Sequence, residues 1–344
     1  MAKLTKDILI GASLALLAAV GHTQELTEVR IGTNNVVSDG LFYIAEAKGF
    51  FKEQGIVPKY FVFDGGPKMI APLGAGQIDV GAAASSAGLF NAVGRGINIK
   101  VVADKGSTPA SYDYIPILVR KALVDSGKVK GFKDFKGLKV AESSKGGSPG
   151  SKLNEALKQA GLSYKSVDHV YMSYPQQVLA LGNGSVDAAV TTEPSATQAI
   201  ENGSAVKISD DSAYPNQQVA VVVYSMDFIK GKPDLAMKFM IAYLKAVRFY
   251  NDAMKAGKLA GPTANEVVNI LIKNTNVKDP AVYRNTTPNG VNPNGKVNVE
   301  GLKKDYDFFA EQGYIEGKAS VEQVVDNSYV ENALKVLGPY TPMK

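Results

Sequence analysis

The 344-residue chain contains no cysteine and only two histidines, His22 and His169. The absence of cysteine excludes disulfides, zinc–thiolate centres, cysteine-ligated iron–sulfur clusters and a cysteine nucleophile. Two histidines are too few for a histidine-rich metal site. Any Ser-His-Asp triad would have to use His169, but no Gly-x-Ser-x-Gly motif accompanies it, so we expect this histidine to be structural. These absences predict a protein without metal or cofactor and argue against an enzyme.

Phosphate-binding motifs are missing as well. Residues 290–297 superficially fit the pattern Gly-x4-Gly-Lys, but Val297 occupies the position where Ser or Thr must hold Mg²⁺. The surrounding stretch, residues 285–298, is rich in Asn, Pro and Gly, which is typical of turns. We therefore interpret it as a connection between helices.

Concentrated charge and long apolar runs are also scarce. The net charge is +5, and Lys and Arg alternate with Asp and Glu, so a nucleic acid partner is not expected. One apolar run, residues 8–20, follows Lys3 and Lys6. Its length of about 13 residues suits the core of a secretion signal and falls short of the roughly 20 that span a bilayer. We predict a signal peptide over residues 1–24, cleaved near residues 19–24, and a periplasmic mature protein.

The feature that the chain does contain is a segment that occurs twice, roughly a hundred residues apart. Residues 72–85 and 180–193 each hold an apolar helix end, a Gly-x-Gly turn, an aspartate and a short apolar strand. The aspartates are Asp79 and Asp187, and each strand ends in small hydroxyl residues. A single repeat at this distance predicts two similar lobes with a ligand cleft between them.

Strands and helices alternate along most of the chain, which favours parallel sheets covered by helices. The pattern restarts after a loop at residues 105–114, and a strand near residues 219–224 leads back towards the first lobe. We place lobe I at residues 25–107 and 226–344 and lobe II at residues 108–225. An amphipathic helix over residues 234–255 and a last helix over residues 321–337 are expected within lobe I.

The loops that follow the predicted strands are small, polar or rich in glycine, and several lead directly into helices. In open parallel sheets, ligands bind beyond the carboxyl ends of strands, and a helix start offers free N–H groups that suit an anion. Each serine in these loops, taken alone, is better explained as a helix N-cap than as a ligand contact. Because six such loops recur at equivalent positions, we expect them to surround one ligand.

The order of these elements resembles the family of periplasmic substrate-binding proteins for sulfonate, nitrate, taurine and thiamine precursors. The resemblance covers most of residues 28–255, and its motifs are residues 44–55, 76–79, 134–140, 184–187 and 193–194. It implies an α/β fold of the type II periplasmic-binding-protein class, with two lobes, each a mixed sheet flanked by helices. The residues that the resemblance places at the ligand are Ser38, Asp39, Gly66, Ser85, Ser86, Ser148, Tyr174, Thr192 and Glu193.

The resemblance also implies a function. The protein would capture a small organic anion, a sulfonate or carboxylate, by closing its lobes, and deliver it to the permease of an ABC importer with its cytoplasmic ATPase. Closure would bend the crossings near residues 105–114 and 210–225, Lys105 and Lys145 could add positive charge, and a monomer is expected.

Two alternatives remain open at this point. A neutral pyrimidine such as a thiamine precursor could hydrogen-bond Glu193 and stack on Tyr174. A buried, unpaired Glu193 would count against a sulfonate. An enzyme on the same fold is disfavoured by the absence of cysteine, and a transcription regulator by the N-terminal signal.

Overall fold

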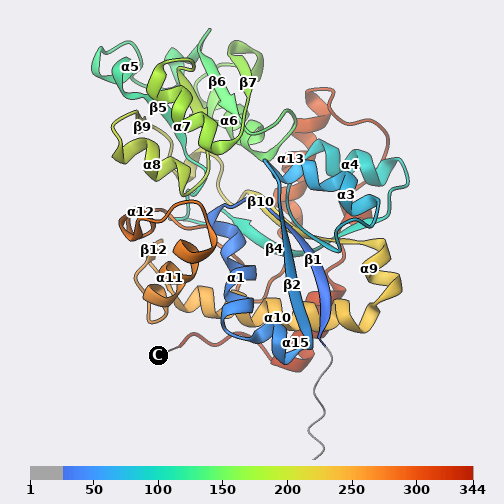
Figure 1. The fold of residues 1–344 in the computed structure, drawn as a ribbon. Coiled ribbons are helices and arrows are strands. Elements are labelled where there is room, and N and C mark those ends of the chain that lie inside the picture. Colours follow the sequence, from blue (N-terminus) through green and yellow to red (C-terminus); the bar gives the residue numbers. More distant parts are fainter. Residues whose placement is uncertain (1–25, 344) are drawn as a thin grey trace, which may run out of the picture.

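The computed structural model describes residues 26–343. Two five-stranded sheets, each with helices on its faces, form two lobes (Figure 1). The predicted signal peptide lies outside the described residues. Within residues 26–343, no helix combines the length and the apolar character that a membrane crossing requires.

The first sheet has the strand order β2-β1-β3-β10-β4. Strands β1, β2 and β3 are parallel, whereas β10 runs antiparallel to both of its neighbours. The strands are β1 Thr27–Thr33, β2 Ile56–Val62, β3 Val80–Ala84, β4 Ile99–Ser107 and β10 Gln218–Ser225. Every residue of β10 is buried, as expected for a strand with neighbours on both sides.

The second sheet repeats this arrangement, with the order β7-β6-β8-β5-β9. Here β6, β7 and β8 are parallel, and β5 runs antiparallel to both β8 and β9. The strands are β5 Ile117–Arg120, β6 Lys139–Glu142, β7 Asp168–Tyr171, β8 Ala188–Val190 and β9 Ala205–Lys207. A short hairpin of β11 Met254–Lys255 and β12 Lys258–Leu259 lies outside both sheets.

Helices cover both sheets. Those of the first half of the chain are α1 Gly40–Ala47, α2 Phe50–Glu53, α3 Ile70–Gly74, α4 Ala87–Gly94, α5 Lys121–Asp125, α6 Ser148–Gln159, α7 Tyr174–Asn183 and α8 Ser195–Glu201. Those that follow β10 are α9 Met226–Gly231, α10 Pro233–Asp252, α11 Ala264–Asn274, α12 Pro280–Asn285, α13 Val299–Glu311, α14 Val321–Val324 and α15 Ser328–Leu337. Short 3-10 helices η1 to η5 span Val37–Asp39, Gly66–Met69, Phe132–Phe135, Tyr164–Ser166 and Asp211–Ala213.

The helix predicted over residues 234–255 corresponds to α10. Its buried side chains include Phe239, Tyr243 and Tyr250, which fall on one face of a helix. Phe239 lies against the rings of Phe42 and Phe51, with centroid distances of 6.1 and 5.0 Å. The amphipathic stripe is therefore core, as expected for a helix that packs on a sheet.

Two boundaries differ from the sequence-based expectation. Strand β10 lies in the first sheet between β3 and β4, whereas the expected boundary at residue 225 counted it with lobe II. The single helix expected over residues 321–337 is broken between α14 and α15, because Val325 bridges to Val101 and the Asp326 N–H bonds the Val101 carbonyl at 2.8 Å. Below, lobe I means the residues around the first sheet and lobe II those around the second.

Candidate functional site

The loops at the strand ends of the two lobes face each other and touch. The Val37 N–H in lobe I donates to the Glu193 carbonyl in lobe II at 3.2 Å. The Ser148 N–H in lobe II donates to the Ser85 carbonyl in lobe I at 3.0 Å. These bonds join the lobes directly, so the structure represents a closed arrangement.

A cavity of about 300 Å³ remains between the lobes. Lobe I lines it with the loops after β1 and β2, and lobe II lines it with the starts of α7 and α8. Asp64 is the only charged side chain in this lining, and its exposed carboxylate pairs with Lys68 at 2.9 Å. The lining residues are Asn34, Asn35, Val36, Val62, Phe63, Asp64, Ser173, Tyr174, Pro175, Pro194, Ser195, Gln198, Asn276 and Val277.

The Asp39 carboxylate lies beneath the loop after β1 and is fully buried. It accepts hydrogen bonds from the backbone N–H groups of Asn34 at 2.8 Å and Val36 at 3.1 Å. The Lys105 ammonium lies 2.5 Å from its other oxygen. Lys105 therefore has a counterion inside the protein, because its positive charge is neutralised by the Asp39 carboxylate. Ser38, the neighbour of Asp39, is buried as well.

The Glu193 carboxylate follows strand β8 and is turned towards helix α8. It accepts from the Thr197 N–H at 2.9 Å and from the Thr286 hydroxyl at 3.4 Å. Burial without a cationic partner raises the pKa of Glu193 to about 6, although these hydrogen bonds lower it in part. The carboxylate thus has its own donors within the protein.

Three of the expected serines lie at the contact between the lobes. Ser86 is the N-cap of α4 and accepts from the Leu89 N–H at 3.4 Å. The Ser148 hydroxyl donates to the Val219 carbonyl at 3.3 Å. Ser85 is fully buried, and its hydroxyl has no hydrogen-bond partner among residues 26–343.

The remaining expected residues occupy separate places. The Tyr174 ring lines the cavity, and its hydroxyl donates to Ser143 at 3.3 Å. The Thr192 hydroxyl donates to the Tyr114 carbonyl at 3.3 Å. A Cβ on Gly66 would lie 2.5 Å from the backbone nitrogen of Ala84, so the close approach of η2 to β3 requires glycine there.

Residues beyond the expected set also carry buried polar atoms, and of those named here only Asn34 lines the cavity. The Tyr114 hydroxyl and Thr191 Oγ1 are buried and have no hydrogen-bond partner among residues 26–343. Tyr114 reaches across to lobe I, since a Cβ on Gly106 would lie 2.5 Å from its hydroxyl oxygen. Other such atoms are Asn34 Oδ1, Ser144 Oγ, Gln177 Oε1 and Gln217 Oε1.

Hydroxyls in this state suit a ligand that accepts hydrogen bonds. Burial raises the pKa of the Tyr114 phenol well above its usual range, so it stays protonated and can donate. A buried donor without a partner costs free energy unless something binds to it. Thr191 is one of the small hydroxyl residues at the end of the second repeat, residues 180–193, whereas a donor role for Tyr114 was not predicted from the sequence.

His169 and Lys145, the other polar candidates from the sequence, have partners away from the cavity. His169 Nδ1 lies 2.7 Å from Glu142, and its ring stacks on Tyr164. The Lys145 ammonium lies over the Tyr314 ring, 5.2 Å from its centroid. Neither residue lines the cavity.

Residues 39–254 match the family described as "NMT1/THI5 like". The chain belongs to this family. The match covers all of α10 and the strand-end loops of both lobes except residues 34–38 of the loop after β1. The predicted family and the predicted two-lobed fold are both confirmed.

Curated relatives bear names of the same kind. The chain is 27% identical to a putative aliphatic sulfonates-binding protein of Bacillus subtilis, over 92% of this chain and 91% of that protein. It is 31% identical to a putative aliphatic sulfonates-binding protein of Escherichia coli, over 45% of this chain and 46% of that protein. These relatives are named as binding proteins, not enzymes.

Solved structures share the fold. The alkanesulfonate-binding protein SsuA of Xanthomonas axonopodis, bound to MOPS, has a TM-score of 0.71 at 20% identity, covering 88% of this chain and 99% of that one. The nitrate-binding protein NrtA of Synechocystis has a TM-score of 0.71 at 14% identity, covering 91% of this chain and 90% of that one. At these identities the likeness shows the fold alone.

Proposed function

We propose that this protein captures a small organic anion, a sulfonate or carboxylate, between its lobes and delivers it to the permease of an ABC importer. The names of its curated relatives support a sulfonate. The cavity between the lobes supports capture by closure, because both lobes contribute to its walls. Bending of the two crossings that connect the sheets would open it.

The observation that carries the anionic assignment is that both cleft carboxylates are already bonded within the protein. Asp39 has Lys105 and two backbone N–H groups, and Glu193 has Thr197 and Thr286. Neither carboxylate lines the cavity, and Lys105 neutralises Asp39, so neither is placed to bind a ring amine there.

The buried hydroxyls of Tyr114 and Thr191 supply donors for the same ligand. A neutral donor set binds an anion through hydrogen bonds to its charged oxygens, which are stronger than bonds between neutral groups. We expect the anionic group near these hydroxyls and the organic part against Tyr174.

The first test is calorimetric titration and thermal unfolding of the purified protein with taurine, alkanesulfonates, carboxylates, nitrate and pyrimidines. Ligand at about 100 times its Kd adds roughly 2.7 kcal/mol to the free energy of unfolding. We expect alkanesulfonates to raise the unfolding temperature. A response to pyrimidines alone would overturn the anionic assignment and point to Glu193.

A second test addresses the donor set. Tyr114→Phe removes one hydrogen bond to a charged group, so affinity for the bound anion should fall about tenfold. The matched control is Tyr171→Phe, which removes the hydroxyl of a tyrosine on β7 that is 40% exposed, whereas Tyr114 is 2% exposed. Equal affinities for the two variants would remove Tyr114 from the site.

A further inference from the structure

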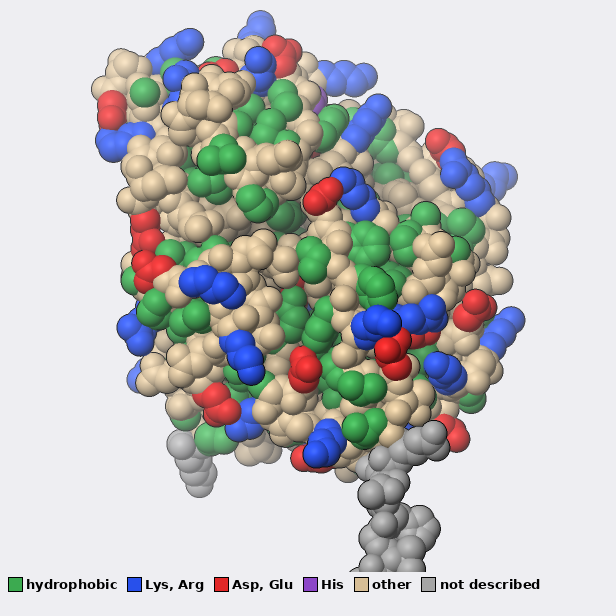
Figure 2. Space-filling model, in the orientation of Figure 1, with side chains coloured by type: hydrophobic (Ala, Val, Ile, Leu, Met, Phe, Trp, Pro, Cys, Tyr) green, Lys and Arg blue, Asp and Glu red, His purple; other side chains and the backbone are tan. Residues whose placement is uncertain are grey.

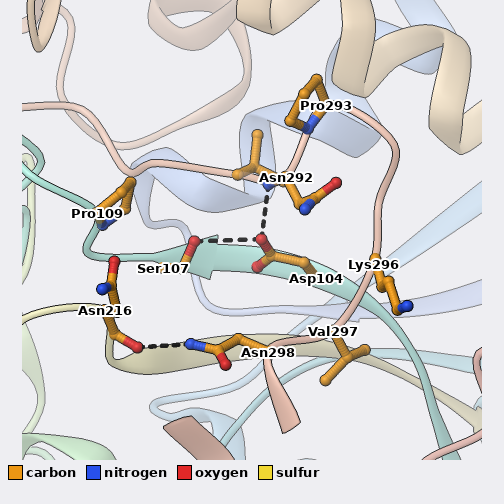
Figure 3. A pocket seen from close by; sticks show the side chains of 10 residues that line it. Asp104, Ser107, Pro109, Asn216, Asn292, Pro293, Lys296, Val297 and Asn298 are labelled. Carbon is orange, nitrogen blue, oxygen red and sulfur yellow. Dashed lines mark hydrogen bonds between the residues drawn. The ribbon is translucent and has the colours of Figure 1, made fainter. Parts of the chain in front are cut away.

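A second cavity, of about 440 Å³, lies at the junction of both crossings and the Asn-rich stretch of residues 285–298 (Figure 3). Asp104 and Ser107 of β4 form one side of it, and Asn292 and Pro293 lie opposite. The buried Asp104 carboxylate is the centre of this junction. It accepts from the Asn292 N–H at 2.7 Å, the Gln218 amide at 2.7 Å and the Ser107 hydroxyl at 3.2 Å.

The Asn-rich stretch is attached to both crossings through further bonds. Gly290 and Ser107 exchange backbone hydrogen bonds at 2.8 and 3.0 Å. On the second crossing, the Asn298 side chain donates to the Asn216 carbonyl at 2.7 Å. The sequence indicates a connection over this stretch, and in the structure the stretch also fixes the end of β4.

Asp104 and Lys105 are neighbours on β4, and their side chains bond different segments of the chain. Asp104 faces the Asn-rich stretch, and Lys105 faces the cleft, where it holds Asp39. Asp39 in turn holds the N–H groups of Asn34 and Val36, and these two residues line the cavity between the lobes. The bonded chain from Asn292 to Val36 is continuous.

We propose that Asp104 and Lys105 are positioning residues that couple the junction of the crossings to the ligand loop, residues 34–39. Lys105 sets the loop through Asp39, and Asp104 sets Lys105 by holding the end of β4. A change on the Asp104 side therefore reaches the cavity without touching it. The effect on ligand affinity rests on the proposed function, whereas the effect on the loop does not.

The ligand-free protein tests the coupling directly. Hydrogen exchange measured by mass spectrometry reports the protection of the Asn34 and Val36 amides, which depends on their bonds to Asp39. Asp104→Asn should raise exchange in residues 34–39 about tenfold, with Ser107→Ala giving a smaller rise in the same segment. Lys105→Met should give the largest rise.

The matched control is Asp305→Asn. Asp305 is also a fully buried carboxylate without a cation, held by Tyr214 and Gln217, and burial raises its pKa, like that of Asp104, to about 6. It contacts neither β4 nor the ligand loop through a side-chain hydrogen bond recorded for the described residues. If Asp305→Asn raises exchange in residues 34–39 as much as Asp104→Asn, the effect is general destabilisation and the proposal is overturned.

A double variant provides a second criterion. In the double variant Asp104→Asn with Lys105→Met, exchange in residues 34–39 should equal that of Lys105→Met alone, because Lys105→Met has already removed the bond that links β4 to Asp39. Additive rises would overturn the coupling. If Lys105→Met does not fold because it leaves the Asp39 carboxylate unpaired, Asp104→Asn is instead combined with the double variant Asp39→Asn and Lys105→Met, which removes both charges.

Titration with ethanesulfonate separates the two proposals. If the native protein binds it, Asp104→Asn should weaken binding about threefold to tenfold while Asp305→Asn does not. If the native protein binds no panel member, the proposed function fails, and the exchange data still decide the coupling. Unchanged affinity together with unchanged exchange in Asp104→Asn would overturn the inference.

Discussion

Each lobe uses an aspartate side chain to join two of its parallel strands, and the two lobes differ in how deeply this aspartate is buried. Asp79 of lobe I and Asp187 of lobe II each follow a Gly-x-Gly turn and bond the backbone of the adjacent parallel strand. Asp79 accepts from the Arg30 N–H at 2.8 Å, and Asp187 accepts from the Lys139 N–H at 3.0 Å. The repeat thus joins β3 to β1 in one lobe and β8 to β6 in the other.

The arginine partners distinguish the copies. Arg30 makes two further bonds to the Asp79 side chain, at 3.0 and 2.7 Å, and the Asp79 side chain is 4% exposed. Arg120 reaches Asp187 with one bond at 3.4 Å, and the Asp187 side chain is 25% exposed. The two copies of the motif therefore contribute unequally to the free energy of unfolding, because a charge-assisted hydrogen bond contributes more when its carboxylate is buried.

The largest predicted effect concerns these two aspartates. Asp79→Ala removes a buried carboxylate and leaves the Arg30 N–H without its acceptor, while the Arg30 side chain, which is 33% exposed, can turn to water; the free energy of unfolding should fall by about 2 kcal/mol. Asp187→Ala should cost about 1 kcal/mol, as expected for a partly exposed site. Urea denaturation of both variants measures this difference. Equal losses of unfolding free energy would contradict the proposal that the two aspartates contribute unequally to stability.

The second prediction contrasts the cleft carboxylates, since Asp39 has a lysine and Glu193 has only neutral donors. The folded-state pKa of Glu193 is raised from 4.5 to about 6. The folded state therefore binds the proton more tightly, and stability is highest below about pH 4.5 and falls as pH rises to about 6. The contribution of this one group is on the order of 2 kcal/mol.

Glu193→Gln isolates the effect of that group from those of other buried acids. The pKa values of Asp104 and Asp305 are also raised to about 6, so the native protein should lose stability over the same pH range for more than one reason. Unfolding measured from pH 4 to 7 should show a smaller decline in Glu193→Gln. A decline as steep as that of the native protein would contradict the assignment.

The glycines of the two turns give a third, smaller comparison. Gly76 and Gly184 both adopt positive φ, 64° and 80°. An added Cβ on Gly76 would lie 2.2 Å from Asp227, whereas one on Gly184 would lie 3.1 Å from Arg120. Gly184→Ala should cost about 1 kcal/mol from backbone strain, and Gly76→Ala should cost more because Asp227 must move. Thermal unfolding ranks the two, and the reverse order would contradict this explanation.

The smallest effect is expected at the strand-end hydroxyls. Thr191→Val removes a hydroxyl that has no partner among the described residues, so stability should change by less than about 1 kcal/mol while anion affinity falls. Ser85→Ala removes a lobe I hydroxyl that is likewise without a partner among the described residues, so it too should change stability by less than about 1 kcal/mol. If Thr191→Val leaves the affinity for alkanesulfonates unchanged, lobe II does not use this hydroxyl.

Much of the fold could be predicted because local patterns carry it. The alternation of strands and helices, the repeat around Asp79 and Asp187, and the apolar stripe of α10 are all visible along the chain. The strand Gln218–Ser225 is harder to place, because its central apolar run does not indicate which of the two sheets it joins. The break at Val325–Asn327 depends on a bridge to Val101 and has no local signal.

The site was predictable in position more than in detail. The strand ends named from the sequence do lie at the contact between the lobes, since the carboxyl ends of strands meet at one edge of each sheet. The direction of each side chain was not predictable. Lys105 pairs with Asp39 and Glu193 turns to Thr197, and both contacts link segments whose distance along the chain carries no information about pairing.

The charge distribution follows the sequence closely. Figure 2 shows Lys and Arg interspersed with Asp and Glu over the visible face, without one large area of a single sign. This agrees with the alternation of charges along the chain and with the absence of a basic stripe.

The sequence by itself determined the elements, the two-lobed α/β class and the family, because periodicity, turn residues and a repeat are local properties of a chain. Only the tertiary structure decided which polar groups remain available to a ligand. Availability depends on what each group already bonds, and those partners come from distant segments: Asp104 with Asn292, Lys105 with Asp39, and Tyr114 facing Gly106 without a partner. The partners of a buried polar group come from segments that only the fold brings together, so they cannot be read from the order of residues.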